Sequence, residues 1–159
     1  MFFEYATPRS RANRHTGGML RTPLIHPPLL AALAAAGHGA GVRIADANYS
    51  HSTNVSPRAT RVHLNLTAGL VTVDQVLEPV LATGPVEAAA VMTPDDGGTP
   101  DAWASYAELL GPEVPMTQLG RHDFYATCRE PDLAICVATG DTRLYTNILL
   151  TVGYIRPSA

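Results

Sequence analysis

The sequence contains no lysine, so its eleven Lys and Arg positions are all arginines. Schiff-base chemistry, attachment of pyridoxal phosphate and the phosphate-binding lysine of a P-loop are therefore excluded. Charge of either sign is sparse, with a formal net charge of −3 on 159 residues. Beyond the three arginines among the first 18 residues there is no basic stripe, so we expect no nucleic acid partner.

Cysteine and long apolar runs are also scarce. Cys128 and Cys136 are the two thiols, and they lack CxxC spacing, which favours reduced, packed cysteines in a cytosolic protein over a disulfide framework. No charged-then-apolar signal peptide opens the sequence, and no apolar run approaches the ~18 residues that a membrane-spanning helix needs. We therefore expect a cytoplasmic protein without a membrane partner.

Motifs for metals and nucleotide cofactors are missing as well. Four histidines (His26, His51, His63 and His122) do not fall into metal-ligand spacing with cysteines or carboxylates. GxSxG, GxGxxG and Walker patterns do not occur. We expect no metal site and no cofactor.

What the sequence does contain suits one globular domain with a substantial core, because 46% of its residues are hydrophobic. Residues 1–18 lack periodicity, concentrate arginine and end in two glycines. We interpret them as a flexible N-terminal extension and residues 19–159 as the domain.

Helical and strand patterns alternate along the domain. Thr72 and Gln75 form a capping box at the start of one helical pattern, and prolines or glycines bound several of the others. Apolar runs and period-two alternation indicate the strands. The expected helices cover residues 29–36, 73–83, 101–110 and 121–129, and the expected strands cover 42–46, 61–66, 86–92, 116–119, 133–138 and 143–151.

This alternation predicts an α/β fold with a mostly parallel sheet and helices on both faces. In such folds ligands gather at the carboxyl ends of the strands. Asp46 ends one expected strand, Arg121 follows a second, and Asp141 follows a third. These polar groups are therefore candidates for one site.

His38 lies between two glycines, just past the first expected helix. Its imidazole is suited to proton transfer near neutral pH, although a loop histidine in a glycine turn is equally compatible with the spacing. Asp46 is eight residues further on. It is expected either to orient His38 or to hydrogen-bond a hydroxyl group, and the alternative is a cap on the following loop.

The last expected strand carries polar groups within an otherwise apolar stretch. A buried phenol, carboxamide or guanidinium needs hydrogen-bond partners, and a polar, sugar-sized ligand is one candidate. Tyr145 and Asn147 are two residues apart, so on a strand they face the same side. Arg121 can bind a hydroxyl or carboxylate with a fork of donors that lysine cannot form.

Several segments, taken in order, resemble the D-ribose pyranase and L-fucose mutarotase family (the RbsD/FucU proteins). The resemblance runs from about Leu24 to Tyr154. Each segment alone is weak, but their order and separation are specific. The segments are Leu29–Leu30, Gly37–Gly39, Ile44–Asn48, Arg121–Tyr125, Thr139–Gly140 and Tyr145–Leu149.

The resemblance implies an RbsD-like three-layer fold and a cofactor-free isomerase that interconverts cyclic forms of a free monosaccharide. It also implies a homo-oligomer, typically a decamer, with the sugar cleft near subunit boundaries. By analogy His38 is the catalytic proton donor and Asp46 is a sugar-binding carboxylate. Asp46 is expected either to set the tautomer of His38 or to bind the sugar. Arg121, Tyr145 and Asn147 take the places of substrate-binding residues. The general base is left open between a water molecule and Tyr145.

The substrate also stays open between two sugars. Arginine at position 121 looks like the fucose branch of the family, whereas residues 62–70 look nearer to the ribose branch. Two other classes of function are compatible with the same residues. One is a non-catalytic sugar-binding or transport-accessory module, in which His38 is dispensable, and the other is a purely structural oligomer.

Overall fold

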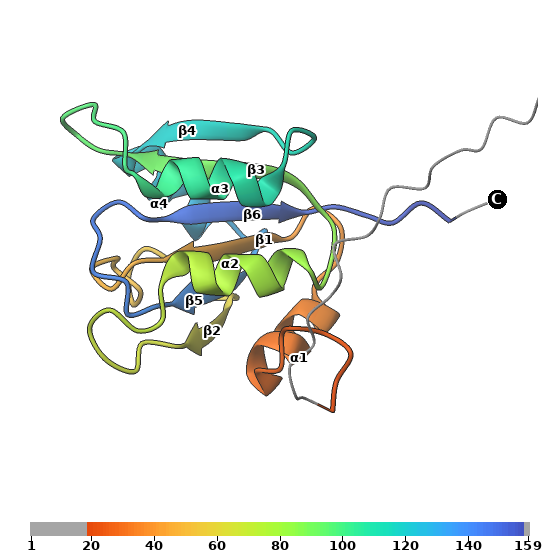
Figure 1. The fold of residues 1–159 in the computed structure, drawn as a ribbon. Helices are drawn as coiled ribbons and strands as arrows, with labels where there is room; N and C mark the ends of the chain where they lie inside the picture. The colour runs from red at the N-terminus through yellow and green to blue at the C-terminus, as the bar shows by residue number, and fades with distance from the viewer. Residues whose placement is uncertain (1–18, 158–159) are drawn as a thin grey trace, which may run out of the picture.

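The computed structural model describes residues 19–157, so the predicted extension over residues 1–18 lies outside the described part. Four helices and six strands follow one another along these residues (Figure 1). In chain order they are α1 (Pro27–Ala35), β1 (Gly41–Ala45), β2 (Thr60–His63), α2 (Val73–Leu81), β3 (Val86–Thr93), α3 (Ala102–Leu110), β4 (Met116–Gly120), α4 (Arg121–Arg129), β5 (Leu133–Ala138) and β6 (Ile148–Val152).

The strands form one sheet in the order β2-β5-β1-β6-β3-β4. Strand β1 pairs in parallel with β5, β2 with β5, and β3 with β4, whereas β6 runs antiparallel to both of its neighbours, β1 and β3. The predicted α/β fold with a mostly parallel sheet is therefore confirmed. One reversed strand lies near its middle.

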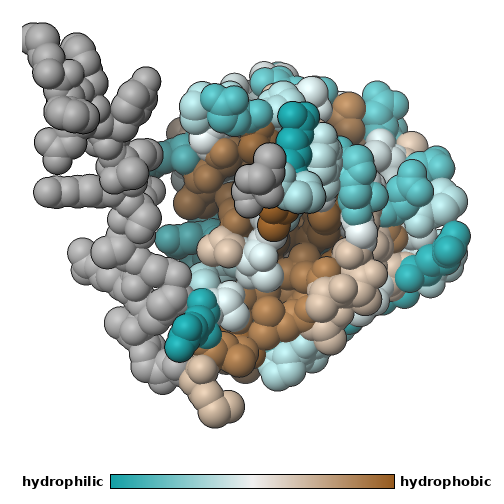
Figure 2. All heavy atoms as spheres, turned by 90° about the vertical axis from the view of Figure 1, so that its right-hand side faces the viewer, coloured by the Kyte–Doolittle hydropathy of each residue, from teal (hydrophilic) through white to brown (hydrophobic). Residues whose placement is uncertain are grey.

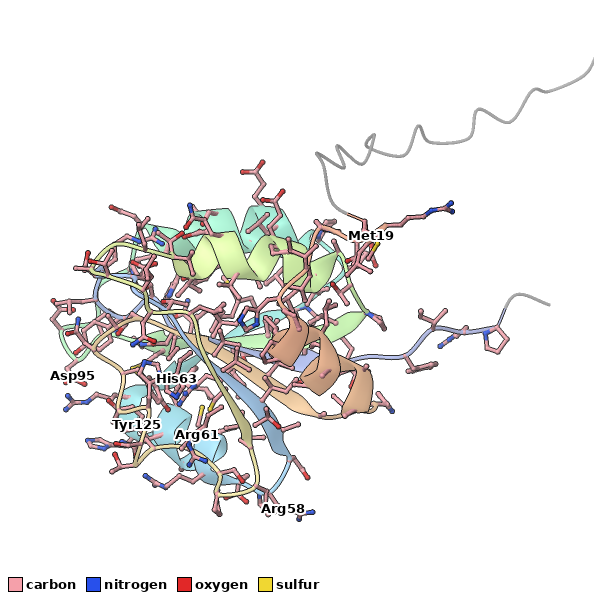
Figure 3. The ribbon with its side chains drawn as sticks, turned by 90° about the horizontal axis from the view of Figure 1, so that it is seen from below. Met19, Arg58, Arg61, His63, Asp95 and Tyr125 are labelled. Carbon is pink, nitrogen blue, oxygen red and sulfur yellow. The ribbon has the colours of Figure 1, made fainter. Side chains whose placement is uncertain are left out.

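Helices cover both faces of the sheet, as the sequence predicts. The apolar residues of α1, α2 and α3 pack with Val42, Ile44 and other side chains on one face. On the opposite face Phe124 and Cys128 of α4 pack with Cys136 and with Tyr49 from the loop after β1. Figures 1 and 3 show the resulting three layers, with α2 and α3 on the side of the sheet opposite α4. Both cysteines are buried and free.

The predicted sequence features at the starts of α1 and α2 are present in the structure. The Thr72 side chain accepts from the Gln75 N–H while the Gln75 side chain accepts from the Thr72 N–H, which is the predicted capping box of α2. Helix α1 has prolines in its first turn, where a missing N–H leaves no bond unmade.

The prediction of a last strand over residues 143–151 is wrong at its beginning, because β6 begins only at Ile148. Residues 141–147 form a turn in which Asp141 accepts from the Arg143 N–H and the Thr146 hydroxyl donates to the Arg143 carbonyl. Tyr145 has φ 60°, a left-handed conformation that no strand accommodates.

The reversed direction of β6 determines which residues meet. Strands β1, β3 and β4 end at one edge of the sheet, and β6 begins there because it runs the other way. The residues just before β6 therefore join the residues just after the parallel strands. We call this edge the carboxyl edge and the opposite one the amino edge.

The amino edge has a different character. A hollow between α1, α2 and the sheet is lined mainly by apolar side chains, among them Leu30, Leu33, Val80 and Val86. Figure 2 looks at this end of the molecule, where apolar residues surround a depression. Across residues 19–157, none of the helices has the length and apolar character needed to span a membrane.

Candidate active site

The carboxyl edge contains a small hollow of about 170 Å³, which we call the polar pocket. It is smaller than the ~300–1,000 Å³ clefts that hold drug-sized ligands, so it suits a small molecule. Four of the six residues that the sequence singles out for a site line it together: Asp46, Arg121, Tyr145 and Asn147. Asp141 and His38 do not line it.

Asp46 follows β1 directly and is 2% exposed. One of its carboxylate oxygens accepts from the Asn48 N–H at 2.9 Å, which closes the turn after the strand. Burial raises the pKa of this carboxyl above its ordinary value of 3.8, and it outweighs the hydrogen bonds that favour the charged form. A carboxyl group with a raised pKa is better matched to accept and return protons near neutral pH.

Asn147 is 3% exposed and immediately precedes β6. Its side-chain oxygen accepts from the Asp46 N–H at 3.0 Å, and its amide nitrogen lies 3.8 Å from the Met92 sulfur. The carboxamide thus joins the beginning of β6 to the end of β1. Its side chain also favours the charged form of the Asp46 carboxyl, so the two polar groups lie together in the pocket.

Tyr145 lines the pocket from a turn and not from a strand. We expected Tyr145 and Asn147 to share one side of a strand, and that premise is wrong because neither residue is in β6. The left-handed turn at Tyr145 places its phenol in the pocket wall instead.

Arg121 begins α4, directly after β4. One of its terminal nitrogens pairs with the Asp95 carboxylate at 3.0 Å. Its Nε is buried and has no hydrogen-bond partner among the residues described. A buried donor without a partner is costly, so this N–H is a candidate contact for a ligand.

Five further lining residues were not predicted as site residues. They are Asn48, Tyr49, Met92, Tyr125 and Leu144. Two of them carried a signal in the sequence, since Asn48 lies two residues after Asp46 in the same turn. Tyr125 lies four residues after Arg121, and residues four apart share one face of a helix. Met92 and Leu144 are apolar and gave no such signal.

His38 lies elsewhere. It precedes β1 at the amino edge, whereas Asp46 follows β1 at the carboxyl edge. The five residues of that strand separate them by roughly 16 Å. The His38 Nε2 pairs with the Glu87 carboxylate at 2.9 Å, and the ring packs edge-on against Tyr154 with centroids 5.1 Å apart. Within one chain, then, Asp46 does not orient His38.

The polar pocket can hold a small polyhydroxylated molecule. Hydroxyl groups both donate and accept, and the residues that line this small hollow include one aspartate, one arginine, two asparagines and three tyrosines. Among residues 19–157 no three His, Cys, Asp or Glu side chains gather as a metal-binding group.

The chain is similar to several known proteins over most of its length. The model of the RbsD / FucU transport protein family matches residues 19–155. A D-ribose pyranase from Paracidovorax citrulli (strain AAC00-1) is 36% identical over 138 residues, which cover 85% of this chain and 98% of that protein. A fucose mutarotase from Danio rerio is 33% identical over 146 residues, which cover 84% of this chain and 92% of that protein. The crystal structure of a fucose mutarotase in complex with L-fucose from Streptococcus pneumoniae has a TM-score of 0.67 and 27% identity, covering 83% of this chain and 95% of that one.

Proposed function

Because this chain belongs to the RbsD / FucU transport protein family, we propose that it interconverts the cyclic forms of a free monosaccharide by acid–base opening of the ring. The observation that carries the proposal is a buried carboxyl of raised pKa, Asp46, in a small polar pocket with Arg121 and Asn147. The relatives named above are a D-ribose pyranase and fucose mutarotases, so a pentose or a 6-deoxyhexose is the substrate class we propose.

The chemistry requires proton transfer only. Opening a hemiacetal removes the proton of the anomeric hydroxyl, adds a proton to the ring oxygen and breaks the bond between that oxygen and the anomeric carbon, which becomes a carbonyl carbon. Closing the ring after rotation reverses each of these changes. Positioned acid and base groups each accelerate such a step by ~10²–10⁴-fold. Asp46 exchanges one of these protons, and Arg121, Tyr145 and Asn147 hold the sugar hydroxyls.

His38 supplies the second proton in this proposal, and it does so from another copy of the chain. Its side chain is half exposed at the amino edge, and Tyr154 and Ile155 nearby are also exposed. Leu70 and Leu144 expose apolar surface at the other end, Leu144 beside the polar pocket. Packing the amino edge of one copy against the carboxyl edge of the next covers both patches and brings His38 to a neighbouring pocket.

Such a head-to-tail contact produces a closed ring when the rotation that relates neighbouring copies is a whole fraction of 360°. The decamer implied by the resemblance, the cytosolic location and the absence of a cofactor remain predictions.

The separation of His38 from the pocket also favours a second candidate, a sugar-binding module without catalytic activity. In that case His38 is dispensable and Asp46, Arg121 and Asn147 bind the sugar. The two candidates differ in one measurable property, which is the rate of exchange between sugar forms at equilibrium.

The test is intersubunit complementation. The His38→Ala and Asp46→Asn variants are assayed separately and after co-expression, by saturation-transfer NMR of ribose and fucose. We expect each variant alone to lose exchange and the mixed oligomer to recover it, because about one site in four then has both groups in a random equal mixture.

Native mass spectrometry establishes that the two variants share oligomers. Mixed oligomers without recovered exchange would contradict the role of His38 across the subunit boundary. Full exchange by His38→Ala alone would remove His38 from the mechanism. A wild-type protein that binds the sugar without accelerating exchange is the outcome that establishes the binding module.

A further inference from the structure

A third hollow lies at the β2 edge of the sheet, and Tyr49 lines both this hollow and the polar pocket. Arg61 and His63 alternate along β2, so both side chains lie on the same face of that edge strand. The loop segment Tyr49–Ser52 forms the other wall. We call this site the edge hollow. Figure 3 shows Arg61 and His63 close to each other on the α4 side of the sheet, with Arg58 farther away.

The edge hollow lies above a buried cation that has no carboxylate partner among the described residues. Arg43 on β1 is 0% exposed, and its guanidinium donates to the Asn54 carbonyl at 3.1 Å and to His51 Nδ1 at 3.2 Å. The same group lies 4.0 Å from the centre of the Tyr49 ring, and its Nε has no partner. A buried charge is normally paired, because desolvation is costly. The positive charge of Arg43 is therefore uncompensated on this side of the sheet.

His51 lines the hollow and contacts Arg43. Its two hydrogen bonds show that its imidazole is neutral. Nδ1 must accept, because the arginine has only donors, so the ring proton is on Nε2 and is donated to the Asp46 carbonyl at 2.9 Å. Burial and the charge of Arg43 lower the pKa of His51 to about 4, in agreement with this assignment. His51 is therefore hydrogen-bonded to the buried guanidinium and adds no charge of its own to the hollow.

Three other side chains of the hollow have donors available to a ligand: Arg61, His63 and Ser50. Neither Arg61 nor His63 forms an ion pair or a side-chain hydrogen bond with the residues that the structure describes. The Ser50 oxygen accepts from the Asn54 amide at 2.6 Å, so its own proton is free to be donated outward. None of the residues lining the edge hollow is acidic.

We propose that the edge hollow binds a phosphate-type oxyanion, held by the Arg61 guanidinium and by the Ser50 hydroxyl and the His63 imidazole. A guanidinium matches two phosphate oxygens with parallel N–H donors, and charge-assisted bonds of this kind are the strong ones. The anion also lies in the field of Arg43 and offsets that buried charge.

Two sources provide this chemistry, free phosphate and the phosphoryl group of a sugar phosphate. The second is included because Tyr49 lines both hollows, which makes them neighbours. In that case the sugar ring occupies the polar pocket and the phosphoryl group occupies the edge hollow. Only this second source depends on the function proposed above.

The test is calorimetric titration of the full chain with inorganic phosphate and with ribose 5-phosphate, at constant ionic strength in chloride. We expect Arg61→Gln to weaken phosphate binding about 10- to 100-fold, the loss of one charge-assisted contact. The matched control is Arg58→Gln, which removes an exposed arginine three positions earlier that does not line the hollow. His63→Gln is the second variant and is expected to weaken phosphate binding in the same direction.

The Asp46→Asn variant distinguishes free phosphate from a sugar phosphate as the source of the anion. If it leaves the affinity for ribose 5-phosphate unchanged, the site is one for free phosphate; if Asp46→Asn and Arg61→Gln both weaken it, the phosphoryl group belongs to the sugar. The proposal is overturned if neither ligand binds, if Arg61→Gln has no effect, or if Arg58→Gln weakens binding equally. Exchange of neutral ribose by Arg61→Gln is expected to stay at the wild-type rate, which separates this test from that of the proposed function.

Discussion

Two buried carboxyl groups at the carboxyl edge of the sheet have pKa values shifted in opposite directions. Asp46 follows β1 and Asp141 comes shortly after β5, its parallel neighbour, and their exposed fractions are 2% and 1%. Burial pushes the pKa of both groups up and prevails at Asp46. At Asp141, hydrogen bonds from Arg143 and from the Val73 N–H outweigh burial, and the pKa lies below 3.8. Burial alone does not determine how readily a carboxyl ionises, because a neighbouring cation can reverse its effect.

Asp141 is a structural anchor. It accepts from the Val73 N–H at 3.0 Å, from the Arg143 N–H at 3.1 Å and from the Arg143 Nε at 3.0 Å. Arg143 also pairs with Asp74 in the first turn of α2. These contacts tie α2 to the turn that carries Tyr145. Asp46 has no cation bonded to it within the described residues and lines a pocket, so its charge is free to respond to a ligand.

The largest expected difference between the two carboxyl groups is in sugar exchange, and the Asp46→Asn variant is expected to show it. The change keeps an oxygen for the Asn48 N–H and removes the exchangeable proton. We expect sugar exchange to fall by ~10²–10⁴-fold, the contribution of one acid–base group. Stability near pH 7 is expected to stay equal or to rise, because the variant no longer buries an ionisable group. Saturation-transfer NMR and urea unfolding measure the two quantities.

The control for this prediction is Asp101→Asn, which removes an exposed carboxylate at the start of α3 whose side chain makes no capping bond. It should change neither exchange nor stability. Exchange retained by Asp46→Asn would assign the proton transfer to another group and leave Asp46 with a binding role.

Much of the fold could be predicted, because each element has its own local signal. Period-two alternation, apolar runs and the capping box of Thr72 identify strands and helices within a few residues. The reversed direction of β6 could not be predicted, since the apolar run Ile148–Leu150 has the same pattern in either orientation. The turn before it was mistaken for strand because its polar bonds join residues far apart in sequence, such as Asp141 and Val73.

The site was predicted in part for a related reason. Asp46, Arg121, Tyr145 and Asn147 meet because strand ends converge at one edge, which is a rule about topology. His38 was placed with Asp46 because only eight residues separate them. Most of those residues form an extended strand, and an extended strand moves its two flanks apart. The buried Asn147 has a hydrogen-bond partner in its own chain, because its side-chain oxygen accepts from the Asp46 N–H.

A smaller effect, on stability rather than exchange, is expected from Asp141→Asn. The amide loses the charge-assisted bonds from Arg143, and removing one partner of such a bond costs about 1–3 kcal/mol of the free energy of unfolding. Urea unfolding with an unchanged m-value measures this loss. The folded variant is expected to keep measurable sugar exchange. Loss of exchange with unchanged stability would mean that Asp141 acts at the pocket and is no anchor.

The smallest effect is the opposite pH dependence of the two carboxyl groups. Asp141 has a lowered pKa in the folded protein, so its contribution to stability is present above about pH 4 and is lost as the pH falls through its folded pKa. Asp46 has a raised pKa, so the folded state is favoured when this group is protonated, and that advantage is lost as the pH rises through the folded pKa. Wild type is therefore expected to lose its stability margin over Asp141→Asn on acidification. Any margin of Asp46→Asn over wild type should shrink over the same range. Unfolding free energies of the three proteins from about pH 3 to pH 7 test both signs, and parallel curves would contradict the assignment of opposite shifts.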